Sequence, residues 1–216
     1  MPQVLKEDVQ KRIVEAAVRL FATKGYAATT IGEIAETAGI STGNVYRYYG
    51  SKDALFDDAL DEPFVRRFET LLHDRVRALA GIDDVRRLDP RAAWYRASEE
   101  LMRFTIEHRL RLVILLGRAE GTRWASFAGE TVEALVRLAL AHFREIEPSL
   151  KVGAATRFAL VRIYEALIET NARILAEYED EAQIRAAVAA FSRYHLAGLR
   201  ALFEAQGDGS ADGPGA

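Results

Sequence analysis

Two very short helices near the N-terminus, joined by three residues, restrict how this chain can fold more than any other feature. Thr30 and Glu33 form a capping-box pattern that starts the first helix, and Gly39 is placed to end it. Ser41 is placed to cap a second helix, which ends near Gly50. Helices of about two turns are unstable alone in water. The sequence therefore predicts that both are held by longer helices on either side.

Suitable neighbours precede and follow the pair. A helix is expected over residues 7–24, and another begins after Ser51 and is broken or kinked at Pro63. The apolar stripe of the first comprises Ile13, Ala16, Ala17, Leu20 and Phe21, and that of the second Leu55, Phe56, Ala59 and Leu60. Two short helices joined by a tight, glycine-containing turn are typical of a helix-turn-helix. We therefore expect a helix-turn-helix DNA-binding domain over residues 1–60.

The remainder of the 216 residues also has helical periodicity, with few prolines and no strand-like alternation. A helix is expected to open at Asp89–Pro90 and run to about Glu107. Further helices are expected near 110–120, 124–145, 153–178 and 181–205. The predicted fold is all-α with about nine helices, in which residues 61–206 form a larger ligand-binding and dimerisation domain. Residues 207–216 have nothing to bury and are expected to be a disordered tail.

The second short helix has one apolar and one polar side. At about 100° per residue, Val45 and Tyr49 face the preceding helix, whereas Arg47 points away from it. The positions around Arg47 are Gly43, Asn44, Tyr46 and Tyr48. This layout suits a helix in the major groove of DNA, with its centre near base edges and its shoulders near phosphates.

The chemistry of that outer side matches DNA. Asn44 and Arg47 can read adenine and guanine, respectively, through bidentate hydrogen bonds. Tyrosine hydroxyls can donate to phosphate oxygens, and Lys52 and Thr30 can reach the backbone from either side. The chain has a net charge of −3, and charges nearly balance in the first sixty residues. General attraction to DNA should therefore be weak, so binding should depend on two domains held at a fixed spacing.

The segment from residue 8 to 58 resembles the DNA-binding domain of the TetR family of bacterial repressors. The resemblance rests on "IVEAAVRLFATKGYAATT", "IGEIAETAGIS" and "TGNVYRYYGSKDALF". Beyond residue 60 only length and helical layout match. By resemblance, the DNA contacts are Thr30, Thr42, Gly43, Asn44, Tyr46, Tyr48 and Lys52. The chain departs from the family at Tyr49, where phenylalanine is usual, and at Gly32, where some relatives place a cation.

A dimer is expected because one short recognition helix reads few base pairs. The predicted interface is a seam on the last helix, formed by Ile184, Val188, Phe191, His195, Gly198 and Leu202. The helix before it has a similar seam, formed by Val161, Tyr164, Ile168, Asn171, Leu175 and Tyr178. Two such helices from each protomer can form a four-helix bundle. Either seam could instead be internal core. The resemblance to the TetR family also implies dimerisation through the last two helices.

The remaining helices are expected to enclose a ligand pocket. Aromatic and polar residues suited to lining it are Trp94, Met102, Phe104, His108, Glu120, Trp124, Phe127, Tyr164, Glu165 and Asn171. Each of these residues could equally be plain core or surface. Aromatic rings combined with acids would suit a small lipophilic or cationic ligand.

The predicted function is therefore a dimeric repressor that a small-molecule effector releases from a palindromic double-stranded DNA operator. An activator of the same fold and an all-α ligand-binding or interaction protein remain alternatives. An enzyme is not expected, because the chain has no cysteine, its four histidines are scattered, and no catalytic motif occurs. We expect no metal or other cofactor. Because no membrane span or signal-peptide pattern is found, a cytoplasmic protein is expected.

Overall fold

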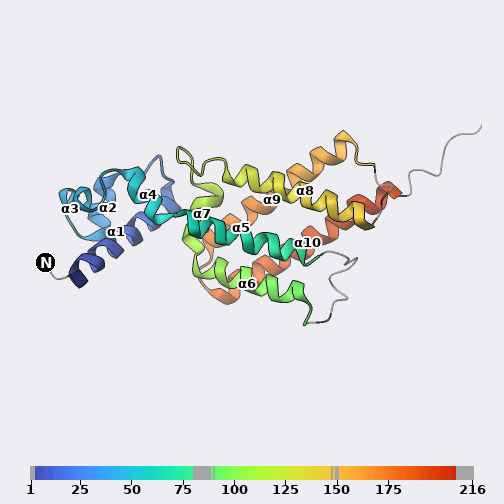
Figure 1. Cartoon of the computed structure of the whole chain (residues 1–216), viewed down its shortest axis with the longest axis horizontal. Helices are drawn as coiled ribbons and strands as arrows, with labels where there is room; N and C mark the ends of the chain where they lie inside the picture. The colour runs from blue at the N-terminus through green and yellow to red at the C-terminus, as the bar shows by residue number, and fades with distance from the viewer. Residues whose placement is uncertain (1–2, 80–88, 90, 147, 149–150, 208–216) are drawn as a thin grey trace, which may run out of the picture.

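The computed structural model describes residues 3–79, 89, 91–146, 148 and 151–207. In that part, ten helices and no strand occur, which confirms the all-α prediction. The N-terminal helices are α1 (Gln3–Lys24), α2 (Ile31–Ala38), α3 (Thr42–Tyr48) and α4 (Lys52–Ala59). The others are α5 (Glu62–Arg77), α6 (Ala93–Glu107), α7 (Arg109–Gly117), α8 (Phe127–Ile146), α9 (Ala154–Glu177) and α10 (Glu181–Gly207). Helices α1 to α4 form one end of an elongated molecule (Figure 1).

Local capping fixes the short helices as predicted. The Thr30 hydroxyl accepts from the backbone N–H of Glu33 at 3.2 Å, and the Glu33 carboxylate accepts from the backbone N–H of Thr30 at 2.9 Å. The hydroxyls of Ser41 and Ser51 cap α3 and α4 in the same way. Gly39 ends α2 in the left-handed conformation, with φ of 65°. The turn between α2 and α3 is therefore determined by two local signals, Gly39 and Ser41.

Three aromatic rings connect the N-terminal helices. The rings of Phe21 on α1, Tyr26 in the following loop and Phe56 on α4 lie 5.0 to 5.6 Å apart, centroid to centroid. Phe21 and Phe56 are almost completely buried. Mutual tilted and edge-to-face contacts of this kind add to the stabilisation that burial provides. This cluster joins α1 to α4, and α2 and α3 pack onto the resulting frame.

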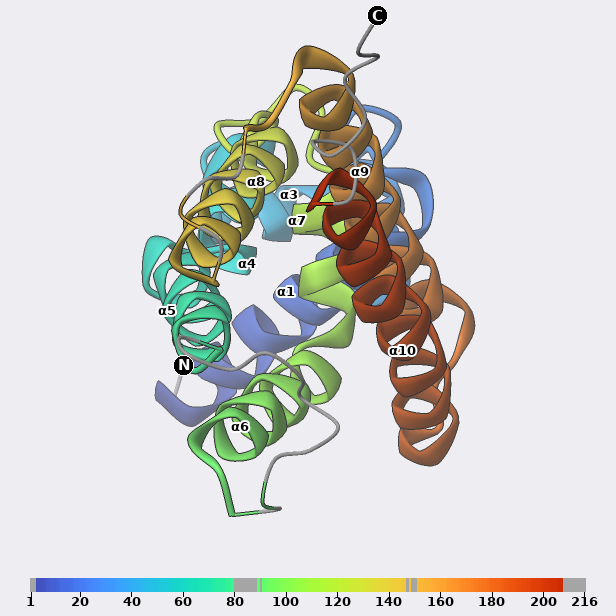
Figure 2. The ribbon, with the colours of Figure 1, turned by 90° about the vertical axis from the view of Figure 1, so that its right-hand side faces the viewer.

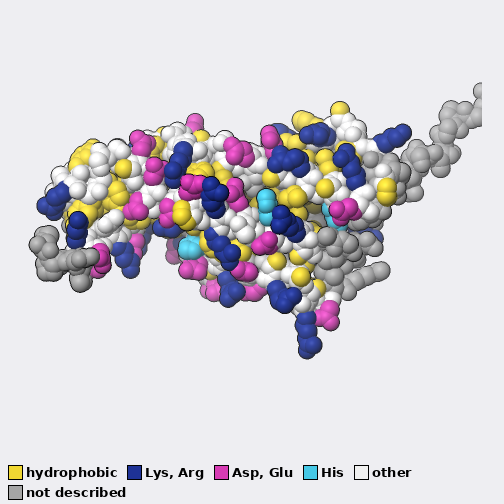
Figure 3. All heavy atoms as spheres, in the orientation of Figure 1, with side chains coloured by type: hydrophobic (Ala, Val, Ile, Leu, Met, Phe, Trp, Pro, Cys, Tyr) yellow, Lys and Arg dark blue, Asp and Glu magenta, His cyan; other side chains and the backbone are white. Residues whose placement is uncertain are grey.

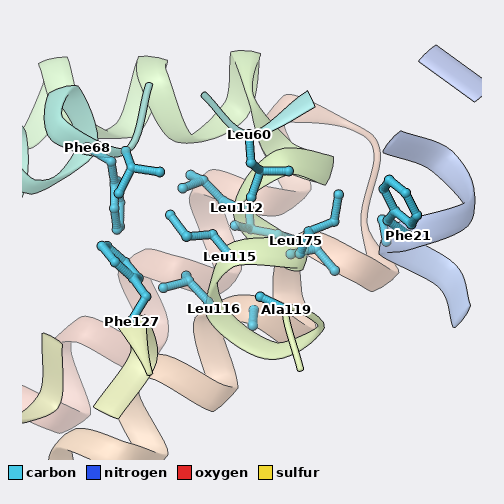
Figure 4. Packing of buried hydrophobic residues seen from close by; sticks show 14 of the residues in the cluster. Phe21, Leu60, Phe68, Leu112, Leu115, Leu116, Ala119, Phe127 and Leu175 are labelled. Atoms are coloured by element: carbon cyan, nitrogen blue, oxygen red, sulfur yellow. The ribbon is translucent and has the colours of Figure 1, made fainter. Parts of the chain in front are cut away.

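In the larger domain, α5, α6, α8, α9 and α10 run roughly along the long axis, and α7 lies across the junction with the N-terminal helices (Figures 1 and 2). Helix α7 is deeply buried, with five consecutive residues from Leu112 to Leu116 in the core. Figure 4 shows its leucines between Leu60 of α4's end and Leu175 of α9, with Phe68 and Phe127 pointing toward one another beside them. Because α7 also packs on α1, one core continues through both parts of the molecule.

The chain is interrupted between α4 and α5, as the proline predicted. Asp61 caps α5 by accepting from the backbone N–H of Phe64 at 2.7 Å, and Pro63 lies in the first turn. The expected opening of the next long helix at Asp89–Pro90 is wrong in position, since α6 begins at Ala93 and its cap residue makes no side-chain hydrogen bond. Asp89 still accepts from the backbone N–H of Arg91 at 2.7 Å, so it caps a turn and not the helix. Pro90 lies outside the described residues.

No helix among the described residues is long and apolar enough to cross a membrane. The predicted tail, apart from Gly207, lies outside the described part of the chain.

Replacing Gly39 with alanine should lower the free energy of unfolding by about 1–2 kcal/mol, because a side chain is strained at its positive φ. The added Cβ would also lie 3.1 Å from the Arg12 guanidinium, which bonds to the end of α2. Urea unfolding followed by circular dichroism measures the change. Gly43→Ala is the matched control, because that position has open space and lies in a helix. Equal stability of the two variants would contradict the role of Gly39 as the left-handed residue that ends α2.

Candidate nucleic-acid interface and ligand site

The outward side of α3 is the candidate DNA-reading surface. Val45 is fully buried and Tyr49 nearly so, whereas Arg47 is exposed and Tyr46 is 53% exposed. The other predicted contacts on α3 are placed as follows: Thr42 and Gly43 exposed, Asn44 and Tyr48 half-buried. The six α3 residues predicted to face DNA thus surround the part of the helix that Val45 does not occupy, with Arg47 and Tyr46 the more exposed and Tyr48 partly packed against the core. Their contacts with DNA stay predictions.

Tyr49 shows why a tyrosine can stand where phenylalanine is usual. Its hydroxyl donates to the carboxylate of Asp58 on α4. Burial, together with this bond to Asp58, raises the pKa of the Tyr49 hydroxyl. The hydroxyl thus fastens the end of α3 to α4 and does not point toward the DNA-facing side.

Thr30 and Lys52 are already engaged within the protein. The Thr30 hydroxyl donates to Glu33 at 3.0 Å in addition to its capping role. The Lys52 ammonium donates to the backbone carbonyls of Tyr26 at 3.0 Å and Thr29 at 2.9 Å, and lies 4.2 Å from the centre of the Tyr26 ring. A lysine ammonium has three N–H donors, so Lys52 keeps one for a phosphate. Its anchoring role was not predicted from the sequence.

The surface around these residues is mixed in charge. In Figure 3, basic and acidic side chains are interspersed on the face in view, with no large field of one sign. Glu33 forms an ion pair with Lys24, and this bond, together with the cap, lowers the pKa of Glu33 to about 2. Sequence-independent attraction to DNA should consequently be small.

The residues predicted to line a ligand pocket do not form one site. Phe104 and Phe127 belong to the aromatic core around Phe68, with ring centroids 6.4 and 6.2 Å from it. The imidazole of His108 packs against Phe104, and burial lowers its pKa. Met102 is half-buried on α6.

The polar residues predicted to line the pocket are exposed or bonded to other groups of the protein. Glu120 is exposed, and Glu165 pairs with Arg162 at 2.7 Å. The Asn171 amide donates to the carbonyl of Leu167 within its own helix at 2.8 Å. No described acid predicted for the pocket therefore faces an enclosed site.

Trp124 lies where the two parts of the chain meet. Its indole N–H donates to the carbonyl of Leu60, at the break between α4 and α5, at 3.1 Å. The neighbouring Arg123 forms an ion pair with Asp57 of α4 at 3.1 Å. Trp124 is therefore a junction residue.

The last two candidates, Trp94 and Tyr164, lie in a buried polar cluster that sequence reasoning missed. Arg75 of α5 lies with its guanidinium 5.4 Å from the centre of the Trp94 ring, and its Nε donates to Ser98 at 3.3 Å. Tyr164 of α9 packs against His195 of α10, with ring centroids 5.2 Å apart. A sequence signal did exist, because Arg75 continues the apolar stripe of Phe64, Phe68 and Leu71 on α5.

A hollow of about 550 Å³ opens elsewhere, between α7, α8 and α9. Apolar residues such as Val113, Val132 and Ile168 line it together with Glu165 and Glu169. Both acids pair with arginines on their own helix. The hollow shares only Glu165 with the predicted ligand residues.

The predicted seam on α10 is largely internal. Ile184 is fully buried and His195 is 8% exposed within one protomer, so both side chains pack mainly inside their own protomer. Their predicted place in the interface stays a prediction. Val188, Phe191 and Leu202 are half-buried on the same side of α10. Gly198 is exposed with open space around it. In α9, Tyr164, Ile168 and Leu175 of the corresponding seam are buried too. Both helices are apolar on two sides, so periodicity could not separate core from interface.

Comparisons with known proteins agree with this geometry. A sequence model described as "Bacterial regulatory proteins, tetR family" matches residues 13–59, which cover the helix-turn-helix. The chain is 29% identical over 174 residues to the uncharacterized HTH-type transcriptional regulator YhgD of Bacillus subtilis (strain 168), covering 74% of this chain and 83% of YhgD. It is 33% identical over 110 residues to the HTH-type transcriptional regulator HbdR of Aromatoleum sp. (strain CIB), covering 45% of this chain and 48% of HbdR.

The similarity to a solved structure extends further along the chain. A TetR-like transcriptional regulator from Rhodococcus sp. RHA1 is 25% identical with a TM-score of 0.51, and the match covers 92% of this chain and 98% of that one. A helix-turn-helix followed by a larger helical domain defines a DNA-binding transcriptional regulator. Residues 13–59 of the chain match the TetR family of these regulators, and the chain as a whole is similar in fold to a TetR-like regulator.

Replacing Lys52 with methionine should lower the free energy of unfolding by about 1–3 kcal/mol, because two backbone carbonyls lose a charged donor. Urea denaturation at neutral pH measures this loss. Lys11→Met is the control, since Lys11 is exposed and its only described ion pair, with Glu15, is 4.0 Å long. If both variants unfolded like the wild type, Lys52 would not anchor the loop.

Proposed function

We propose that this regulator is a dimeric repressor that binds a palindromic operator and is released by a small ligand in its larger domain. The observation that carries the proposal is the side of α3 that exposes Arg47 while Val45 and Tyr49 hold the helix in place. Residues 1–60 would bind DNA and residues 61–206 would bind the ligand and the second protomer. The same protein could act as an activator, because the position of the operator decides whether transcription is repressed or activated.

Each candidate contact has a role that follows from its chemistry. Asn44 and Arg47 read base edges in the major groove, and Gly43 leaves room for close approach. Thr42, Tyr46 and Tyr48 donate to phosphates on the two sides of the groove. Lys52 contributes through its one remaining donor, and Thr30 only if its hydroxyl turns away from Glu33.

Dimerisation would use the outer side of α9 and α10, in place of the buried seam. Two of the largest exposed apolar residues are on these helices, Phe158 at 66% and Tyr194 at 74%. Small exposed residues near Tyr194, among them Ala190, Ala197 and Gly198, would let a second copy approach closely. Phe191, Val188 and Leu202 would lie at the edge of this face.

Communication between the two parts would pass through α5. A ligand against α5 can shift it relative to α4, because the chain is interrupted at Leu60 and Asp61. The contacts that resist such a shift are Trp124 to Leu60 and Arg123 to Asp57. The effect on operator affinity is limited by the difference in the ligand's affinity for the two states.

The rival interpretation is an all-α ligand-binding protein that does not regulate transcription, and an enzyme is a more distant one. Relatives in the comparisons are transcriptional regulators, which supports the regulatory role. A cytoplasmic location follows from that role, because the operator is there.

Selection of bound duplexes from a random pool by the purified protein, at a salt concentration near physiological, tests the function. We expect a palindrome whose half-sites are about 34 Å or a multiple apart. Asn44→Ala and Arg47→Ala should each change the preferred bases, whereas Tyr46→Phe should weaken all duplexes alike. No consensus from a folded dimer would contradict the proposal, and an unchanged consensus in both alanine variants would contradict the base-reading assignment.

Tyr194→Arg should convert the dimer into monomers, because it places a charge in an apolar interface. Analytical ultracentrifugation measures the change, and circular dichroism shows whether each protomer stays folded. Tyr46→Arg is the matched control, since Tyr46 is an exposed tyrosine at the other end of the molecule (Figure 1). A Tyr194→Arg protein that remained dimeric would rule out this face.

A further inference from the structure

The polar cluster between α5, α6, α9 and α10, in which Tyr164 and His195 are buried and Arg75, Trp94 and Ser98 half-buried, has an excess of positive charge. Among the described residues, no carboxylate pairs with the Arg75 guanidinium, which contacts the Ser98 hydroxyl and the Trp94 ring. Burial lowers the pKa of the Arg75 guanidinium from its ordinary value. A buried guanidinium without a counter-charge is costly, so proteins usually pair it.

The same cluster has an unused donor. The indole Nε1 of Trp94 is buried and has no hydrogen-bond partner among the described residues. Trp94 lies directly beside Arg75, whose guanidinium is over its ring. Buried donors of this kind are rare in proteins, and a bound water molecule or ion is one of the usual reasons for them.

Tyr164 and His195 complete the cluster. Burial raises the pKa of the Tyr164 hydroxyl to about 12, so the hydroxyl keeps its proton at neutral pH. Burial, and then the charge of Arg75, lowers the pKa of His195 to about 4, so the imidazole is neutral. Arg75 thus remains the one described cation of the cluster, surrounded by neutral groups that can donate.

Acids on the neighbouring helices are engaged elsewhere. Glu99 of α6 pairs with Arg185 of α10 at 2.8 Å, and Glu100 pairs with Arg67 of α5. Glu165 of α9 pairs with Arg162. Asp74, which precedes Arg75 in the chain, is exposed. None of these described carboxylates balances Arg75.

We propose that this cluster binds the carboxylate of a small organic acid, with Arg75 as the charge partner and Trp94, Tyr164 and Ser98 as neutral donors. A planar guanidinium matches a carboxylate in shape and can bond it bidentately. One monoanion balances one guanidinium, whereas a phosphate dianion would leave excess negative charge. A water molecule could satisfy Trp94 but would leave Arg75 unbalanced.

This inference rests on the proposed ligand-binding role of the larger domain and identifies the class of ligand. It replaces a cationic ligand with an anionic one, because the acids that a cation would need are paired or exposed. Binding would hold α5 against α6, α9 and α10. Helix α5 directly follows α4 of the DNA-binding end, and α9 and α10 carry the proposed dimer face. One bound anion could therefore alter both the position of the DNA-binding end and the dimer interface.

Isothermal titration of the full chain with benzoate, without DNA, tests the inference, and benzamide serves as the uncharged match. We expect benzoate to bind and benzamide to bind at least about tenfold more weakly. Arg75→Gln should weaken benzoate binding at least about tenfold. Arg75→Lys should have an intermediate affinity for benzoate, because lysine keeps the positive charge but cannot bond a carboxylate bidentately. Arg77→Gln, two residues further on α5 and exposed, should bind like the wild type.

Two additional readouts separate a binding role from a structural one. Thermal unfolding should show that Arg75→Gln is at least as stable as the wild type, because it removes an unbalanced buried charge. Benzoate should raise the melting temperature of the wild type and leave that of Arg75→Gln unchanged. Trp94→Phe should weaken benzoate binding, whereas Trp124→Phe should not.

The inference is overturned by any of three results. These are a dissociation constant weaker than about 10 mM for benzoate, binding of inorganic phosphate but not benzoate, or undiminished benzoate binding by Arg75→Gln. Because DNA is absent from this titration, its failure would leave the duplex selection unaffected. Conversely, if benzoate bound but duplex selection gave no consensus, the proposed regulatory function would be refuted and the proposed carboxylate site would stand.

Discussion

The packing of a seven-residue helix onto longer ones is the constraint on which the DNA-binding end depends. Helix α3 is too short to be stable alone, so Val45 and Tyr49 must hold it from within. Those two residues rest on α2 and α4, which the Phe21, Tyr26 and Phe56 cluster fixes to α1. The exposed side of α3 is free to carry asparagine and arginine because its opposite side supplies the stability.

The same dependence links DNA binding to the larger domain. Helix α1 packs on α7, and Tyr26 donates its backbone N–H to the carbonyl of Arg118 at 3.2 Å. The contact of Trp124 with Leu60 joins the loop before α8 to the break between α4 and α5. A ligand that moved α5 would therefore act on the helix that directly follows α4 and packs on α6. Neither part has to unfold for the other to respond.

Local signals in the sequence predicted the N-terminal part well, because caps and glycine turns depend on a few neighbouring residues. Thr30, Ser41, Gly39 and Ser51 act as expected. Burial of α10 could not be predicted, since a helix with two apolar sides does not reveal which one meets its own protomer. Similarly, the cluster around Arg75 combines residues from four helices far apart in sequence. Only the position of Arg75 on an apolar stripe hinted at it.

In the proposed dimer, the separation of the two α3 helices is the quantity that would link ligand binding to DNA binding. The chain has no cysteine, so Thr37→Cys on the exposed side of α2 gives one spin label per protomer. Electron–electron double resonance then reports one distance between protomers. We predict a narrow distance distribution with operator bound and a shifted one when a ligand of the larger domain, with benzoate as the probe, releases the operator. No coupling between labels, or an unchanged distance after release, would contradict this account.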